Sequence, residues 1–220
     1  MKLASILVSL ETKNNRRHTH QKGVPMQRFD LSYPLDDNAF KAMKALAPSD
    51  LPVPQKELFG HIGTHLDLMG KTYPDEYFTL SGRVFDVRHI SGRDIDMVDI
   101  DLESIREKDF VFFHSGCLAS FPYASKEYIF APIQLSWKLI QALLDKKTAM
   151  VGIDFAGIRL PKEHRKADTL CAESGTFVVE NVYGLENLVT AAEGKTFTVH
   201  CYPMRLTDAS GLPCRVIASL

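Results

Sequence analysis

The residues best suited to chemistry lie close together in residues 60–67, which read GHIGTHLD. His61, His65 and Asp67 all occupy odd-numbered positions, so on an extended strand their side chains would point to one side. On a helix, Asp67 would lie well round the cylinder from the two histidines. Gly63 disfavours a helix and leaves space between the histidines on the same face. We therefore expect a strand that presents two imidazoles and one carboxylate, which are good ligands for zinc or a similar divalent ion.

A purely structural role is the alternative for these histidines. A single half-buried histidine is more often hydrogen-bonded to the backbone than bound to a metal, and the pattern HxxxHxD alone is only moderately specific. Two histidines and an aspartate on one face favour the metal site. In a weaker alternative, the metal has been lost and the histidines serve packing alone.

The overall composition excludes several classes of function. The chain has 220 residues, with 26 lysines and arginines against 27 aspartates and glutamates and a formal net charge of −1. A protein that binds nucleic acid independently of its sequence would carry a strong basic excess, and the balance also removes the usual reason to expect an anionic membrane as partner. No apolar run approaches the roughly 20 residues needed to span a bilayer. We expect a small-molecule substrate and neither a nucleic-acid nor a membrane partner.

The four cysteines indicate a reducing compartment. Cys117, Cys171, Cys201 and Cys214 are widely spaced and form no CxxC pair, which argues against a cysteine zinc site and against a disulfide framework. The apolar run of residues 3–10 is short and lacks a small-residue cleavage site, so it favours an ordered strand or short helix over a signal peptide. We expect a cytoplasmic protein.

The pattern of apolar residues predicts an N-terminal extension followed by one domain. Residues 11–27 are polar, so we expect an extension over residues 1–27 and a single domain over residues 28–220. Strand-like and helix-like segments alternate in this domain, which is typical of the α/β class with a mixed sheet. The expected strands are residues 28–33, 82–90, 110–113, 149–153, 177–179, 196–199 and 214–218, and the expected helices are residues 37–46 and 134–146.

Residues 61–67 resemble the HxGTHxD core of the cyclase family, which includes bacterial kynurenine formamidases and isatin hydrolases. Further segments resemble the family in the right order, and together they extend from about residue 28 to the end of the chain. A single match would be weak, whereas several in order are specific. The additional matching segments are Asp30-Leu31-Ser32, Gly152-Ile153-Asp154, Val179-Glu180-Asn181 with Leu185-Glu186-Asn187-Leu188, and Pro203-Met204-Arg205-Leu206 with Gly211-Leu212-Pro213-Cys214-Arg215.

The resemblance implies a fold of the swivelling β/β/α type, in which a mixed, barrel-like sheet is flanked by helices. It also implies a site for two divalent ions, zinc or alternatively manganese, and a homodimer or homotetramer. The metal ligands that it implies are His61, His65, Asp67, His164 and Glu180.

The spacing of His164 departs from the family pattern. His164 lies 16 residues before Glu180, a separation that is usually several residues shorter in the family, so residues 168–175 would accommodate an insertion. If His164 is not a ligand, then Glu163 and Cys171 are the nearby substitutes. The alternative for His164 itself is a surface histidine among basic neighbours.

Two further departures from the family pattern concern catalysis. The family motif continues as DxPxH, and its last histidine is assigned proton transfer, but this chain has Met69 at the proline position and Lys71 at the histidine position. Two nearby metal ions would lower the pKa of Lys71, so Lys71 could take part in proton transfer. It could equally hold an anionic group of the substrate, or be a solvated lysine. Asp67 is the second residue expected to be catalytic.

The TGW-like turn of the family is altered as well, and reads Ser115-Gly116-Cys117 here. A pocket aromatic residue is therefore missing. Phe121, Tyr123 and Tyr128 follow closely and could supply replacement walls, although aromatic residues at this density more often serve packing.

The resemblance and the candidate ligands together predict a metal-dependent hydrolase that acts on a small cyclic amide or an aryl formamide through metal-activated water. The turn at residues 115–117 lacks the GxSxG pattern of a serine nucleophile, and phosphate-binding loops of the usual patterns are absent from the sequence. The alternative is a catalytically weakened member of the same fold that binds a metal or a small molecule.

Overall fold

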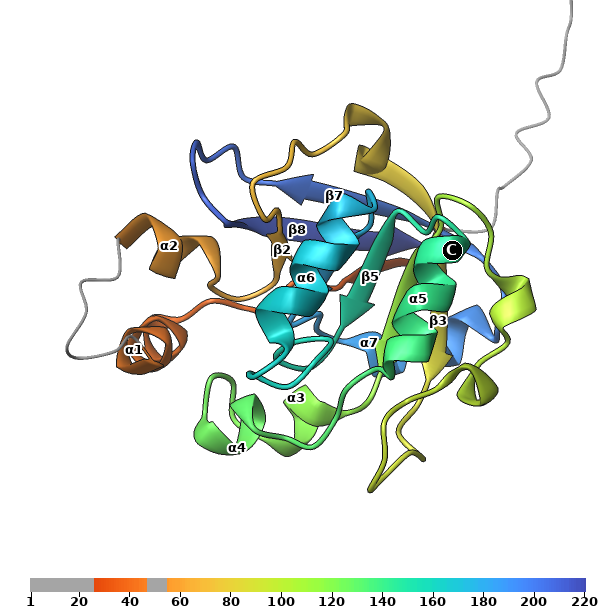
Figure 1. Ribbon diagram of the computed structural model, residues 1–220, viewed down its shortest axis with the longest axis horizontal. Helices are drawn as coiled ribbons and strands as arrows, with labels where there is room; N and C mark the ends of the chain where they lie inside the picture. Colours follow the sequence, from red (N-terminus) through yellow and green to blue (C-terminus); the bar gives the residue numbers. More distant parts are fainter. Residues whose placement is uncertain (1–25, 47–54) are drawn as a thin grey trace, which may run out of the picture.

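The structure is a computed structural model that describes residues 26–46 and 55–220 (Figure 1). The extension expected over residues 1–27 lies almost entirely outside the described residues. The helices and strands, with η for 3₁₀ helices, are β1 (Arg28–Asp30), α1 (Asp37–Leu46), α2 (Gln55–Gly60), β2 (His65–Asp67), η1 (Asp75–Phe78), β3 (Thr79–Asp86), η2 (Met97–Asp99), η3 (Leu102–Ser104), β4 (Phe110–His114), α3 (Cys117–Ser120), α4 (Lys126–Ile129), α5 (Trp137–Asp145), β5 (Met150–Ile153), α6 (His164–Glu173), β6 (Phe177–Glu180), α7 (Leu185–Ala192), β7 (Phe197–Pro203) and β8 (Gly211–Ser219).

Seven of these strands close into a mixed barrel. Their order is β8-β2-β6-β5-β4-β3-β7, and pairing of β7 with β8 completes the ring, while β1 adds to β8 outside it. Strands β3, β4, β5 and β6 run parallel to one another, and every other pairing is antiparallel. The expected α/β fold with a barrel-like mixed sheet and flanking helices is confirmed.

The alternation of side chains along β4 explains why the fold has two cores. Phe110 and Phe112 point into the barrel, whereas Val111 and Phe113 pack against the helices on the outer face. All four are fully buried, as expected for a parallel strand covered on both faces. Gly152 on β5 leaves room for this arrangement, because a Cβ there would lie 2.5 Å from the ring of Phe112.

Helices α5 and α6 cover the outer face of the parallel strands (Figure 1). Ser136 caps α5 by accepting a hydrogen bond from the Leu139 N–H, and the predicted helix at residues 134–146 is confirmed in slightly shorter form. Helix α6 occupies the region where an insertion was expected. It buries Ala167 and Cys171 in the outer core, and it also buries the carboxylate of Asp168. A buried carboxylate is costly unless it is hydrogen-bonded, paired with a cation or bound to a metal, so Asp168 requires such a partner.

The expected strands of the barrel are present, with shifted ends. The strand expected at residues 82–90 begins and ends earlier, as β3, and the strand expected at residues 28–33 is shortened to β1. All four cysteines are buried and free. In the part of the chain that the structure describes, no helix combines the length and the apolarity needed to cross a membrane.

Candidate metal centre

The segment of residues 61–67 forms a turn followed by a short strand, so the strand expected over its whole length is wrong. Helix α2 ends at Gly60, the chain turns, and only His65–Asp67 forms strand β2. Gly63 adopts a φ of 62°, and a Cβ there would meet the Leu35 side chain at 2.8 Å, so the space beside Gly63 holds Leu35 and not a ligand. Despite the turn, the His61 Nδ1 lies 3.2 Å from the Asp67 Oδ1.

His65 is oriented with one ring nitrogen free. Its Nδ1 lies 2.9 Å from the carbonyl oxygen of Gly63, to which it donates a hydrogen bond. The Nε2 is therefore the unprotonated nitrogen, and it is buried without a hydrogen-bond partner among the described residues. It faces the Asp67 Oδ1 at 3.7 Å and the Glu180 Oε2 at 3.5 Å. Burial lowers the pKa of His65 to about 4, so the ring is neutral at pH 7, as a metal ligand must be.

The ring nitrogen of His61 that points away from Asp67 is held by a chain of hydrogen bonds through Ser210 to Glu57. The His61 Nε2 lies 2.8 Å from the Ser210 Oγ, and the Ser210 hydroxyl donates to the carboxylate of Glu57 on α2. The serine oxygen therefore accepts from Nε2–H, and Nδ1 faces Asp67. Burial lowers the pKa of His61, but the hydrogen bond and charge of Asp67 outweigh this effect and raise it. A partner that holds the outer nitrogen in this way is typical of metal-ligating histidines. Gly211 makes room for the ring, since a Cβ there would lie 2.7 Å from it.

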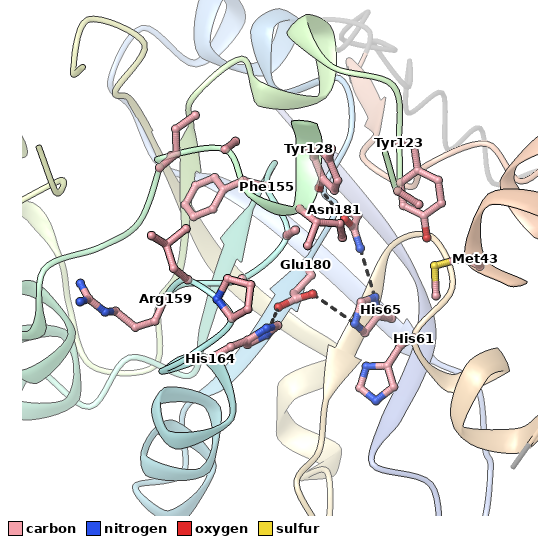
Figure 2. A pocket seen from close by; sticks show the side chains of 18 residues that line it. Met43, His61, His65, Tyr123, Tyr128, Phe155, Arg159, His164, Glu180 and Asn181 are labelled. Atoms are coloured by element: carbon pink, nitrogen blue, oxygen red, sulfur yellow. Dashed lines mark hydrogen bonds and ion pairs between the residues drawn. The ribbon is translucent and has the colours of Figure 1, made fainter. Parts of the chain in front are cut away.

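A second group of ligand atoms lies on α6 and β6. Glu180 ends β6 directly opposite His65 in the antiparallel pairing of β2 and β6. The His164 Nε2 lies 2.7 Å from the Glu180 Oε1 and 3.0 Å from the Asp168 Oδ2. The position of Glu180 between His164 and His65 is visible in Figure 2.

The buried charges of the second group shift its pKa values strongly. Burial raises the pKa of Glu180, and burial together with the charge of Asp67 raises the pKa of Asp168. Burial lowers the pKa of His164, but the charges of Glu180 and Asp168 outweigh this effect and raise it to about 12. Several acidic groups thus crowd around one imidazolium, an arrangement that a bound cation would stabilise.

The two groups share Asp67 and together fit divalent metal ions. One consists of His61, His65 and Asp67, and the other of Asp67, His164, Asp168 and Glu180, with the ligand atoms of each group within 4.8 Å of one another. The buried atoms without a hydrogen-bond partner in the described residues include one atom each of His65, Asp67 and Asp168. Imidazole and carboxylate are ligands that both zinc and manganese accept.

Two cavities with largely different linings reach this cluster. The aromatic cavity, of about 300 Å³, is lined by the three histidines and Glu180 at its base and otherwise largely by apolar side chains (Figure 2). Its walls include Tyr123, Tyr128, Phe155, Ile129, Ile133 and Leu160. The acidic cavity, of about 580 Å³, is lined by Glu57, His61, Asp67, Met69, Pro161, His164, Arg165, Asp168 and Ser210.

The charged and polar groups of the aromatic cavity are mostly engaged with the protein. Arg159 is buried and bonds Asp94 and Glu163. The Tyr128 hydroxyl donates to the Asn181 side chain. The Tyr123 hydroxyl accepts a 2.7 Å hydrogen bond from the Gly63 N–H, and it donates to no acceptor in the described residues.

The remaining residues singled out from the sequence lie elsewhere. Lys71 is exposed and lines neither cavity. The backbone before it explains this position, because Met69 has a φ of 47°, which a proline cannot adopt. The chain therefore leaves Asp67 along a different path from the one that DxPxH implies.

The alternatives considered for His164 also lie outside the ligand cluster. Glu163 bonds Arg159 and Trp137, and Cys171 lies in the outer core. Tyr123 and Tyr128 do line the aromatic cavity, but Phe121 does not. Asp168 was not predicted as a ligand. Its spacing of four residues from His164, on a stretch that can form a helix, is the signal that would have found it.

Comparison with known proteins identifies the family. The sequence model of the family described as "Putative cyclase" matches residues 29–158, more than half of the chain. The chain belongs to this cyclase family. The match contains the first ligand group and ends before His164. No curated protein matches the chain.

Solved structures share the fold at low sequence identity. A structure described as a potential metal-dependent hydrolase with cyclase activity has a TM-score of 0.65 and 21% identity, covering 88% of this chain and 98% of its own. A predicted metal-dependent hydrolase from Bacillus stearothermophilus gives 0.62 and 19%, with coverages of 89% and 99%. Isatin hydrolase A from Labrenzia aggregata, bound to benzyl benzoate, gives 0.67 and 16%, with coverages of 89% and 94%.

Proposed function

We propose that this cyclase-family protein is a metal-dependent hydrolase that acts on a small cyclic amide or an aryl formamide. Two divalent ions, zinc or manganese, are held by His61, His65, Asp67, His164 and Glu180. The observation that carries the proposal is the position of Asp67, which is the one residue common to both ligand groups. A carboxylate shared in this way is suited to hold two ions close together.

The metal ions would supply Lewis acidity and lower the pKa of a bound water towards ~7. The protein residues provide the framework for this chemistry. Hydrogen bonds to Gly63 and Ser210 fix the rings of His65 and His61, so the opposite ring nitrogens already face Asp67 before an ion binds. Asp67 and Glu180 supply the negative charge that balances the ions in a buried site.

The aromatic cavity gives the substrate its chemical class. It is small, apolar and adjacent to the ligand cluster, so it suits the ring of a compact aromatic or bicyclic substrate. Since Arg159 is already paired with two carboxylates, the cavity offers no free cation for a charged substrate among its described lining residues. The amide carbonyl would then lie at the base, and the Tyr123 O–H on the cavity wall could donate to its oxygen.

Substitution of a buried ligand tests the proposal. The His65→Ala variant should lose bound metal and, with it, hydrolysis of formanilide and of simple lactams. Full activity in the absence of metal would contradict the proposal. Metal binding by the wild-type protein without hydrolysis of any amide would favour the alternative of a binding protein on the same fold.

We further propose that the protein acts in the cytoplasm as a homodimer or homotetramer. Four free, buried cysteines suit a reducing compartment. Sedimentation of the purified protein would measure the oligomeric state directly.

A further inference from the structure

Asp168 faces the ligand side of His164. Its Oδ2 lies 3.0 Å from the His164 Nε2, the same nitrogen that faces the Glu180 Oε1 at 2.7 Å. A carboxylate that merely orients a ligating histidine would bond the opposite ring nitrogen, as Ser210 does for His61. One N–H can serve these two converging oxygens only as a shared and therefore weaker donor, whereas a metal ion can bind all three atoms.

The remaining oxygen of Asp168 strengthens this assignment. Asp168 is 4% exposed, and its Oδ1 is buried without a hydrogen-bond partner in the part of the chain that the structure describes. An unsatisfied carboxylate oxygen at this depth is costly unless a cation accompanies it. Asp67 Oδ2 is in the same condition. Both residues line the acidic cavity, which gives an ion a path to the cluster from outside.

The two ligand groups differ in chemistry once Asp168 is included. His61, His65 and Asp67 offer two nitrogens and one oxygen, whereas the second group offers one nitrogen and three oxygens. Imidazole suits zinc, and carboxylate oxygens suit manganese and other harder ions. Asp168 increases this difference between the two groups, because it adds a third carboxylate to the second group.

We propose that Asp168 is a metal ligand and that it makes the two sites unequal, with zinc preferred in the imidazole-rich site and manganese accepted in the carboxylate-rich site. The inference rests on the proposed metal-dependent function and specifies how its two sites differ. It assigns to Asp168 a direct contact with the second ion.

Manganese binding provides a test that does not depend on activity. Metal-free protein is first loaded with one equivalent of Zn²⁺ and then titrated with Mn²⁺, while the signal of free Mn²⁺ is followed by electron paramagnetic resonance. We expect the wild-type protein to bind one equivalent of Mn²⁺ beside the zinc. Asp168→Asn should weaken Mn²⁺ binding about tenfold or more and leave the zinc in place. Glu173→Gln, which changes an exposed carboxylate on the same helix, is the matched control and should bind like the wild type.

A second variant keeps the test decisive if Asp168→Asn folds poorly. Asp168→His replaces an oxygen ligand with a nitrogen ligand, so the second site should still bind an ion but shift its preference from manganese towards zinc about tenfold. Unchanged Mn²⁺ affinity in Asp168→Asn, or unchanged preference in Asp168→His, would overturn the role of Asp168 alone. A wild-type protein that binds neither ion would overturn the proposed function, and the inference with it.

Discussion

The His164 Nε2 lies 2.7 Å from the Glu180 Oε1, across the gap between helix α6 and strand β6. In the metal-free protein this pair holds a proton, because burial raises the pKa of Glu180, and the charges of Glu180 and Asp168 outweigh burial and raise the pKa of His164 to about 12. A histidine must be neutral to bind a metal, so the ion has to displace this proton. We expect metal binding at pH 7.5 to release about one proton from this pair, and the apparent affinity to keep rising with pH through neutrality, because the raised pKa of His164 lies well above 8.

Calorimetric titration in two buffers of different ionisation enthalpy would measure the number of protons released. The His164→Ala variant should release fewer protons than the wild type, because the displaced proton is absent. Metal binding that releases no proton in the wild type would contradict the ion pair.

Ser210 offers a test of how His61 is held. It lies between His61 and Glu57 and fixes which ring nitrogen of His61 carries the hydrogen. Ser210→Ala should weaken metal binding by about 10–100-fold, the range typical for loss of such an orienting partner. Ser174→Ala, on the exposed end of α6, is the control and should leave the affinity unchanged. Equal affinities in both variants would show that Ser210 does not position the ring.

Tyr123 should contribute to catalysis through its free O–H. Tyr123→Phe removes a donor from the wall of the aromatic cavity and should lower kcat by about 10²-fold if the donor meets the developing oxyanion. The variant also leaves the buried Gly63 N–H without its acceptor, which should reduce the free energy of unfolding by about 1–3 kcal/mol. Tyr128→Phe is the comparison variant, because the Tyr128 hydroxyl already donates its hydrogen to the Asn181 side chain and is not free to donate to a substrate. A kcat unchanged in Tyr123→Phe would remove Tyr123 from the mechanism.

A substitution of Lys71 tests the three roles that the sequence left open for it, namely proton transfer, binding of an anionic substrate group, and a solvated surface lysine. Because Lys71 is exposed and lines neither cavity, Lys71→Ala should change kcat/KM by less than about twofold, in line with a solvated surface side chain. Hydrolysis measured at several pH values would check this expectation. A large loss of activity with an altered pH profile would restore the proton-transfer role that its position in the family motif suggests.

The fold was largely predictable because its signals are local and redundant. Phe110–Phe113 and residues 149–153 are continuous apolar runs, as buried parallel strands require. Local apolar patterns do not indicate that β7 pairs with β8 and closes the barrel. The barrel-like sheet was expected only from the resemblance to the cyclase family. Strand ends shifted by a few residues, because they depend on pairing partners distant in the sequence.

The clustering of the candidate ligands was predicted partly for the wrong reason. Odd-numbered spacing suggested one strand face for residues 61–67, but the structure brings His61 to Asp67 through a turn that Gly63 permits. Asp168 was not predicted because the separation of His164 and Glu180 is longer than in the family, which suggested an insertion at residues 168–175. Helix α6 instead places Asp168 one turn after His164, so both reach the same site.

Metal content per chain is the most direct test of the central claim. Protein purified without chelators or a metal-binding tag should contain, or take up, about two zinc or manganese ions per chain by elemental analysis. The His65→Ala variant should hold fewer. A wild-type protein that holds no metal, even after incubation with both ions, would contradict the account.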